Sequence, residues 1–137
     1  MAKTDLADRL EDVRLRIANA CGKVGREPKE VTLLAVTKYA GPEQIREVLR
    51  LGVADLGESR VQQLVQRAAQ INEFHTRRRT AGDIDVPTKV RWHMIGHLQR
   101  NKIKQAMPIV SLVHSVDSLR LAEDLESHFE KSPPESN

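Results

Sequence analysis

The chain has 137 residues, of which 39% are hydrophobic, 30% charged and only 3% aromatic. This composition predicts one globular domain with a core, because a disordered chain combines low hydrophobicity with high net charge. The formal net charge of +3 is small and spread along the chain, and aromatic platforms for base stacking are scarce. We therefore expect no specific nucleic-acid partner.

A single cysteine, Cys21, excludes an intramolecular disulfide and a cysteine-based zinc site, and it favours a reducing compartment. No segment has the length and apolar character of a signal peptide or a membrane span. The sequence therefore predicts a cytoplasmic protein without a membrane partner.

The first predicted element is a helix. Apolar residues spaced by three and four predict that it runs to about Ala20, with Thr4 as its cap and Gly22 at its end. A polar connection then leads to the apolar run 31–38, which is bounded by turn residues. Such a run predicts a buried strand of a parallel sheet.

The run 31–38 ends on a lysine. Side chains alternate along a strand, so Lys38 shares a face with Leu34 and Val36. It would lie at the carboxyl end of a buried strand, where α/β sheets keep their ligands. The alternative is a strand-end lysine whose side chain reaches into water, which is the more common case for an arbitrary lysine.

The rest of the chain alternates predicted helices and strands. Helices are predicted at 43–51, 61–73, 98–107 and from caps at Ser115 and Asp117 through Phe129; strands are predicted at 53–57, 90–95 and 109–114; a polar loop is predicted at 75–88 and a disordered tail at 132–137. A helix followed by four strand–helix units predicts an α/β domain over residues 1–131 with a parallel sheet. A closed (β/α)8 TIM barrel takes ~250 residues, so the chain is either a small open domain or half a barrel.

Four blocks of sequence resemble one family. They are LAVTK at 34–38, LGES at 56–59, WHMIGHLQRNK at 92–102 and HSVDS at 114–118. In this order they resemble the pyridoxal phosphate homeostasis proteins, the YggS-like proteins also called proline synthase co-transcribed homologues. The third block is the most specific, and the resemblance runs from the first helix to about Glu126.

The resemblance implies an α/β barrel of the alanine racemase N-terminal domain type, of which this chain holds the N-terminal half. It implies pyridoxal 5′-phosphate (PLP) bound as a Schiff base to Lys38, in a protein that holds PLP and passes it to PLP-dependent enzymes without established turnover. The residue chemistry agrees, because a Schiff base needs a neutral amine and burial disfavours the ammonium form.

Two departures from the family pattern concern the cofactor. Ser59 stands where the family has the asparagine of Gly-Glu-Asn, which is expected near the cofactor ring. The loops that hold the phosphate belong to the missing half, and no glycine-rich turn in residues 1–137 replaces them, so weak binding is expected. Ile95, at the carboxyl end of the third strand, either packs on the ring or is a core residue.

The remaining polar candidates have weaker patterns. His93 either contacts the cofactor or is a hydrogen-bonded structural histidine, and the face on which it lies is left open. Glu58 is expected at the start of the following helix, where the helix dipole favours a carboxylate. His97 and His114 lack the spacing of a metal site, so no metal is assigned.

Two other functions stay open. One is a racemase-like enzyme that uses the same lysine, for which the only tyrosine, Tyr39, is too close to act as the opposing acid–base group. The other is a remnant that acts as an interaction module. Four strand–helix units leave two open sheet edges and an apolar face with Leu34 and Val36, so a homo-oligomer is expected to cover them.

Overall fold

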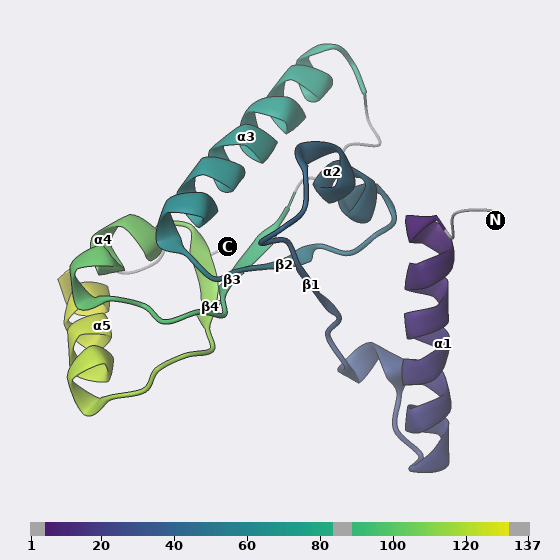
Figure 1. Ribbon diagram of the computed structural model, residues 1–137, viewed down its shortest axis with the longest axis horizontal. Helices are drawn as coiled ribbons and strands as arrows, with labels where there is room; N and C mark the ends of the chain where they lie inside the picture. The colour runs from purple at the N-terminus through teal and green to yellow at the C-terminus, as the bar shows by residue number, and fades with distance from the viewer. Residues whose placement is uncertain (1–4, 84–88, 132–137) are drawn as a thin grey trace.

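The computed structural model describes residues 5–83 and 89–131, and it confirms the α/β class and the predicted order of elements (Figure 1). The helices are α1 Leu6–Lys23, α2 Pro42–Arg50, α3 Val61–Thr80, α4 Ile103–Ala106 and α5 Leu119–Lys131, with 3-10 turns η1 Pro28–Glu30 and η2 Arg100–Lys102. The strands are β1 Leu34–Val36, β2 Asp55–Glu58, β3 Arg91–Met94 and β4 Val110–Val113. Within these ranges, no helix combines the length and the apolar character that crossing a membrane requires.

The four strands form one parallel sheet in the order β1-β2-β3-β4, so each strand lies beside the next one in the chain. Val36 pairs with Gly57, and Gly57 pairs with His93, which sets the register across the first three strands. The strand order does not reverse, as it does in doubly wound sheets. All three crossovers therefore advance in one direction.

One face of the sheet carries the core. Its strand residues Leu56, Trp92 and Met94 are at most 4% exposed and pack against the helices. The helical members of this cluster are Ile45, Leu49, Val61, Leu64, Ile71, Ile103, Ala106, Leu121 and Leu125. The opposite face, called here the open face, carries Val36 and Leu112, which are 51% and 52% exposed.

The first strand is shorter and less buried than predicted. The expected strand 31–38 is ordered as β1 only over Leu34–Val36, and no residue of β1 is buried. Ala35 packs against the core, while Val36 points to the open face. The apolar run therefore forms a strand that is covered on its core face only, because no layer of the described residues lies on the open face.

The predicted loop at 75–88 is wrong over its first part. Helix α3 continues to Thr80, and His75 is only 5% exposed. Burial lowers the pKa of His75, and the charge of Arg79 acts in the same direction. The guanidinium groups of Arg46 and Arg78 lie over the Phe74 ring, 4.6 and 5.8 Å from its centroid. These contacts extend the helix, and arginine itself is a good helix former.

Helix α1 differs from its prediction at its end. The helix continues through Gly22 to Lys23, and the side chain of Asp5 accepts a hydrogen bond from the Asp8 N–H at 2.8 Å. Thr4, the predicted cap, lies outside the described residues. Figure 1 shows α1 at the side of the molecule. Among its described residues, only Cys21 is buried.

The last two predicted helices are corrected as well. The segment 98–107 forms only the short η2 and α4. Helix α5 is capped by Ser118, whose hydroxyl accepts from the Leu121 N–H at 3.1 Å, and not by Ser115 or Asp117. Leu119, expected on the apolar face, is 76% exposed, because the helix turns Leu121 and Leu125 toward the core instead.

Adjacent positions of α3 test how the core is built. Leu64 is 0% exposed and Val65 is 37% exposed. We expect Leu64→Ala to lower the free energy of unfolding by about 3 kcal/mol, since it leaves a cavity. Val65→Ala should change it by less than about 1 kcal/mol. Urea unfolding followed by circular dichroism measures both, and equal losses would contradict the assigned helix face.

Candidate functional site

The three residues expected near a cofactor all follow the carboxyl ends of strands. Lys38 lies two residues beyond β1, Ser59 one residue beyond β2, and Ile95 one residue beyond β3. Val36 pairs with Gly57, so a register continued by two positions would set Lys38 beside Ser59, although Lys38 itself lies in a turn beyond the last strand pair. The next step of the same register sets Ser59 beside Ile95. We call these three positions, which follow the carboxyl ends of neighbouring strands, the edge row.

Backbone hydrogen bonds carry the pairing past the strand ends. The Thr37 N–H donates to the Gly57 carbonyl and the Ile95 N–H to the Glu58 carbonyl, both at 3.0 Å. The His114 N–H likewise donates to the Met94 carbonyl at 2.9 Å. These bonds fix Ile95 directly, and they fix Thr37 and Glu58, the residues that precede Lys38 and Ser59. His114, the residue after β4, is the fourth member of the row.

Contacts bring Ser59 and Ile95 into one patch. A Cβ at Gly96 would lie 2.1 Å from the Ser59 carbonyl oxygen, so only glycine lets these two loops touch. A Cβ at Gly57 would lie 2.8 Å from Cδ2 of Leu34 and 3.3 Å from Cδ1 of Ile95. Ile95 therefore packs with Leu34 above Gly57 on the open face and not in the core cluster, and its contact with a cofactor ring stays a prediction.

Lys38 is less buried than expected. It occupies an exposed β-turn that is closed by a hydrogen bond from the Ala40 N–H to the Thr37 carbonyl at 3.0 Å. Its ammonium lies 5.3 Å from the ring centroid of Tyr39, which is itself 91% exposed. The described residues therefore leave the Lys38 amine accessible to solvent, because nothing among them covers the open face.

Glu58 is placed differently from the prediction. It is the last residue of β2 and not the start of α3, and it is 0% exposed. Its Oε1 accepts a hydrogen bond from Thr37 Oγ1 at 2.6 Å and lies 2.7 Å from Nε of Arg67. Side chains alternate along β2, so Glu58 lies on the same face as Leu56. Treating Glu58 as the first residue of a helix does not reveal this face. Neither Thr37 nor Arg67 was expected to matter.

The open face also carries a polar chain. Nε and Nη2 of Arg91 donate to the two carboxylate oxygens of Asp55 at 2.8 and 2.6 Å. His93 Nε2 bonds to Asp55 Oδ1, and His93 Nδ1 bonds to His114 Nε2, both at 2.9 Å. The Arg91 hydrogen bonds hold the pKa of Asp55 below its ordinary value, and His93 adds to this effect. These contacts match the structural alternative for His93 and settle its face.

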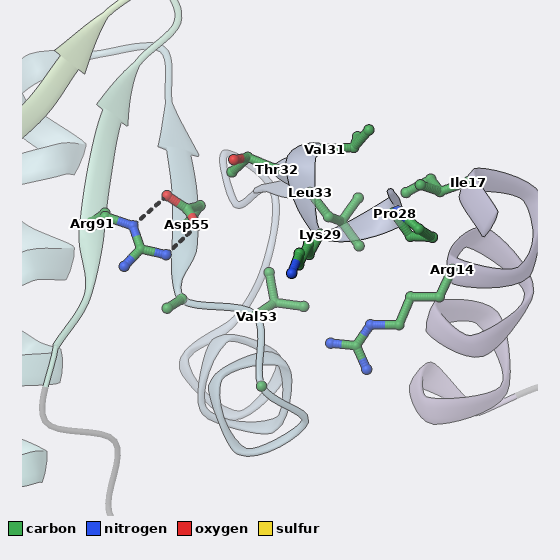
Figure 2. A pocket seen from close by; sticks show the side chains of 12 residues that line it. Arg14, Ile17, Pro28, Lys29, Val31, Thr32, Leu33, Val53, Asp55 and Arg91 are labelled. Carbon is green, nitrogen blue, oxygen red and sulfur yellow. Dashed lines mark hydrogen bonds and ion pairs between the residues drawn. The ribbon is translucent and has the colours of Figure 1, made fainter. Parts of the chain in front are cut away.

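Two hollows lie at opposite ends of the sheet. One of about 600 Å³ is at the carboxyl edge, where Ser59, Arg60, His97 and Lys102 contribute to its lining. The other, of about 450 Å³, lies at the amino ends between α1 and the strands, with Arg14 on one side and the ion pair of Arg91 with Asp55 on the other (Figure 2). In the described part of the chain, no cluster of His, Cys, Asp and Glu could hold a metal ion.

No family model matches the chain. The curated pyridoxal phosphate homeostasis protein of Aquifex aeolicus is 34% identical over 125 residues, which are 91% of this chain and 49% of that protein. The structure of a protein described as unknown, from Bifidobacterium adolescentis, is 33% identical with a TM-score of 0.74, covering 91% of this chain and 49% of that chain. The chain thus spans about half the length of the curated relatives it matches.

A third match concerns a protein with a bound cofactor. The structure of PipY from Synechococcus elongatus with PLP bound is 29% identical to this chain, with a TM-score of 0.63. It covers 84% of this chain, which spans 48% of PipY. The similarity therefore extends over most of this chain and again over about half of its relative.

The Asp55 carboxylate gives the open face a predictable response to acid. Its contribution to stability is complete above 3.8, the ordinary pKa, and is lost as the pH falls through the lower pKa of the folded state. Asp55→Asn should cost about 2 kcal/mol at pH 7, the typical worth of hydrogen bonds to a charged group. The variant should also lose less stability than the wild type between pH 5 and about pH 2. Parallel unfolding curves of the two proteins over this range would contradict the assignment.

Proposed function

The chain belongs to the pyridoxal phosphate homeostasis proteins, and we propose that it binds PLP covalently through Lys38 and holds it without turnover. One observation carries this proposal. Lys38 lies in the edge row at the carboxyl ends of the strands, with its amine accessible and its turn fixed by hydrogen bonds. Ligands of parallel α/β sheets bind at this edge.

The residues present fit the ring end of the cofactor. Bound PLP supplies an aldehyde, and an unprotonated Lys38 amine can condense with the aldehyde carbon, forming a C=N bond with release of one water. Ser59 offers a hydroxyl and Ile95 an apolar side chain in the same row. An aromatic ring with polar substituents requires both kinds of contact.

The phosphate end has less support from this chain. A phosphate monoester brings ~1.5 to 2 negative charges, which need several donors. The connections that follow the described strands carry single glycines, such as Gly41 and Gly96, and not a glycine-rich cradle. We therefore propose weak, reversible binding, with the covalent bond to Lys38 as its main anchor.

We propose holding and transfer to PLP-dependent enzymes in the cytoplasm rather than racemisation. A racemase needs a second acid–base group on the far side of the substrate carbon. The Tyr39 ring lies against the ammonium of its own neighbour, Lys38, on the same side. Incubating the chain with PLP and L-alanine in D2O should leave the α-proton in place, and its exchange above the rate with PLP alone would favour the racemase.

We also propose that the sheet is half of a barrel that a second copy completes. Eight parallel strands in sequential order close a barrel, and four are described here. A twofold axis along the barrel would set β1 of each copy beside β4 of the other, so both open edges would gain a parallel partner. The half-exposed Val36 and Leu112, and a groove of about 1570 Å³ along β4, would be covered.

The covalent proposal predicts a specific spectral change. Adding PLP to the wild-type chain should produce the visible absorbance of a lysine adduct with saturable dependence on PLP. Lys38→Ala should lose most of it, whereas Lys104→Ala, at an exposed position outside the edge row, should retain it. Indistinguishable titrations of the wild type and Lys38→Ala would refute the proposal.

The assembly proposal predicts a dimer. Sedimentation equilibrium of the wild type should give twice the 15.5 kDa of one chain. Leu112→Lys places a charge on the open face and should shift the chain toward monomer. Leu119→Lys is the matched control, because Leu119 is 76% exposed on α5 and away from the sheet. A folded wild-type monomer at all concentrations would contradict the twofold barrel.

A further inference from the structure

The residues on both sides of Lys38 are held by one buried ion pair. Thr37, which precedes Lys38, donates from Oγ1 to Glu58 Oε1 at 2.6 Å. Ala40, which follows it by two, accepts at its carbonyl from Nη1 of Arg67 at 2.7 Å. Arg67 Nε lies 2.7 Å from the same Glu58 oxygen. A strand, a helix and a turn are thus joined at one carboxylate.

The two anchors lie at the two ends of a single turn. The Ala40 N–H bonds to the Thr37 carbonyl at 3.0 Å, so Lys38 and Tyr39 are the central residues of the turn. Thr37 is 2% exposed, whereas Lys38 and Tyr39 are exposed. The base of the turn is therefore fixed in the interior, while the side chain that it carries reaches outward. We call Thr37, Glu58 and Arg67 the turn clamp.

The turn clamp carries a desolvation cost, because it removes two charged side chains from water. Glu58 is 0% exposed, and the Arg67 side chain is 16% exposed. The Nε–H of Arg67 does not point at the carboxylate, so this contact is an ion pair without a hydrogen bond, and Glu58 Oε2 has no protein donor among the described residues. Apolar residues in place of a buried ion pair frequently leave stability unchanged or higher. Stability alone therefore does not account for the pair.

The position of the ion pair on both sides of Lys38 does explain its presence. The clamp contacts the backbone or side chain on each side of Lys38 and leaves the amine itself free. A reacting group that is misplaced by about 1 Å can lose about 100-fold in rate, and fixing its base reduces the entropy lost when it reacts. Resting on the proposed function, we propose that Glu58 and Arg67 are positioning residues that hold the Lys38 turn ready for the aldehyde of PLP before PLP binds.

Two conservative variants test the clamp while leaving charges in place. Thr37→Val keeps the β-branched shape and removes the hydroxyl that bonds to Glu58. Arg67→Lys keeps the positive charge, but a single ammonium lacks the fork that reaches both Glu58 and Ala40. Leu64→Val is the matched control, because it weakens the packing of the same helix and leaves every bond of the clamp in place.

The first readout needs no cofactor. Amide hydrogen exchange at Ala40 reports the bond that closes the turn. Thr37→Val and Arg67→Lys should each raise its exchange rate about tenfold, relative to amides of α5 in the same sample. Leu64→Val should raise it no more than it raises those α5 amides. If neither clamp variant changes Ala40 selectively, the positioning role is overturned, whatever happens with PLP.

The second readout uses PLP. After brief exposure and borohydride reduction, peptide mapping compares the pyridoxyl label on Lys38 with the label on the other lysines of the same molecule. The ratio should fall about tenfold in both clamp variants, and Leu64→Val should keep it. An unchanged ratio in the folded clamp variants overturns the inference. A wild type without preference for Lys38 overturns the proposed function instead, and the Ala40 exchange then still reports whether the clamp fixes the turn.

Discussion

The buried ion pair between Glu58 and Arg67 is the interaction on which the geometry around Lys38 depends. It joins the end of β2, the second turn of α3 and the turn after β1, which are the three elements that border the first part of the sheet edge. The cost of removing these charges from water is offset only when the partners stay in register. Any rearrangement of this corner would leave a carboxylate buried without its cation. The pair therefore favours a single arrangement of the turn over several of similar energy.

The open face is divided along the strand direction into two parts of different chemistry. Toward the amino ends, the polar chain from Arg91 through Asp55 and His93 fixes side chains that would otherwise be unpaired. Toward the carboxyl ends, the side chain of Leu34 and that of Ile95, a member of the edge row, meet over Gly57 and form an apolar floor. Both side chains of this floor are partly exposed in the described part of the chain.

Much of this arrangement follows from local pattern, because strand alternation and turn residues act over short stretches. The order of the elements, the parallel sheet and the shared face of Leu34 and Val36 were predictable in this way. The exposure of Lys38 was not predictable, because exposure depends on what covers a face of the sheet, and the sequence of one strand does not contain that information. The position of the row was predictable only once the register of three strands was known.

Two of the errors involve contacts that are distant in sequence. Glu58 was assigned to a helix start because its partners Thr37 and Arg67 are separated from it in the chain. The helical continuation through His75 depends on packing around Phe74, which polarity alone does not show. The family resemblance identified Lys38 and Ser59 by motif, but it carried no information about what holds the turn. Side-chain partners across the sheet supply that part of the site.

The most direct test of the Lys38 site is a structure of the chain after reaction with PLP and reduction with borohydride. We expect a pyridoxyl group on Nζ of Lys38, with the bonds from Thr37 to Glu58 and from Arg67 to Ala40 unchanged from those seen here. A group attached to another lysine would contradict the assigned site. A group on Lys38 with both of those bonds broken would contradict the claim that the buried pair positions the turn in advance.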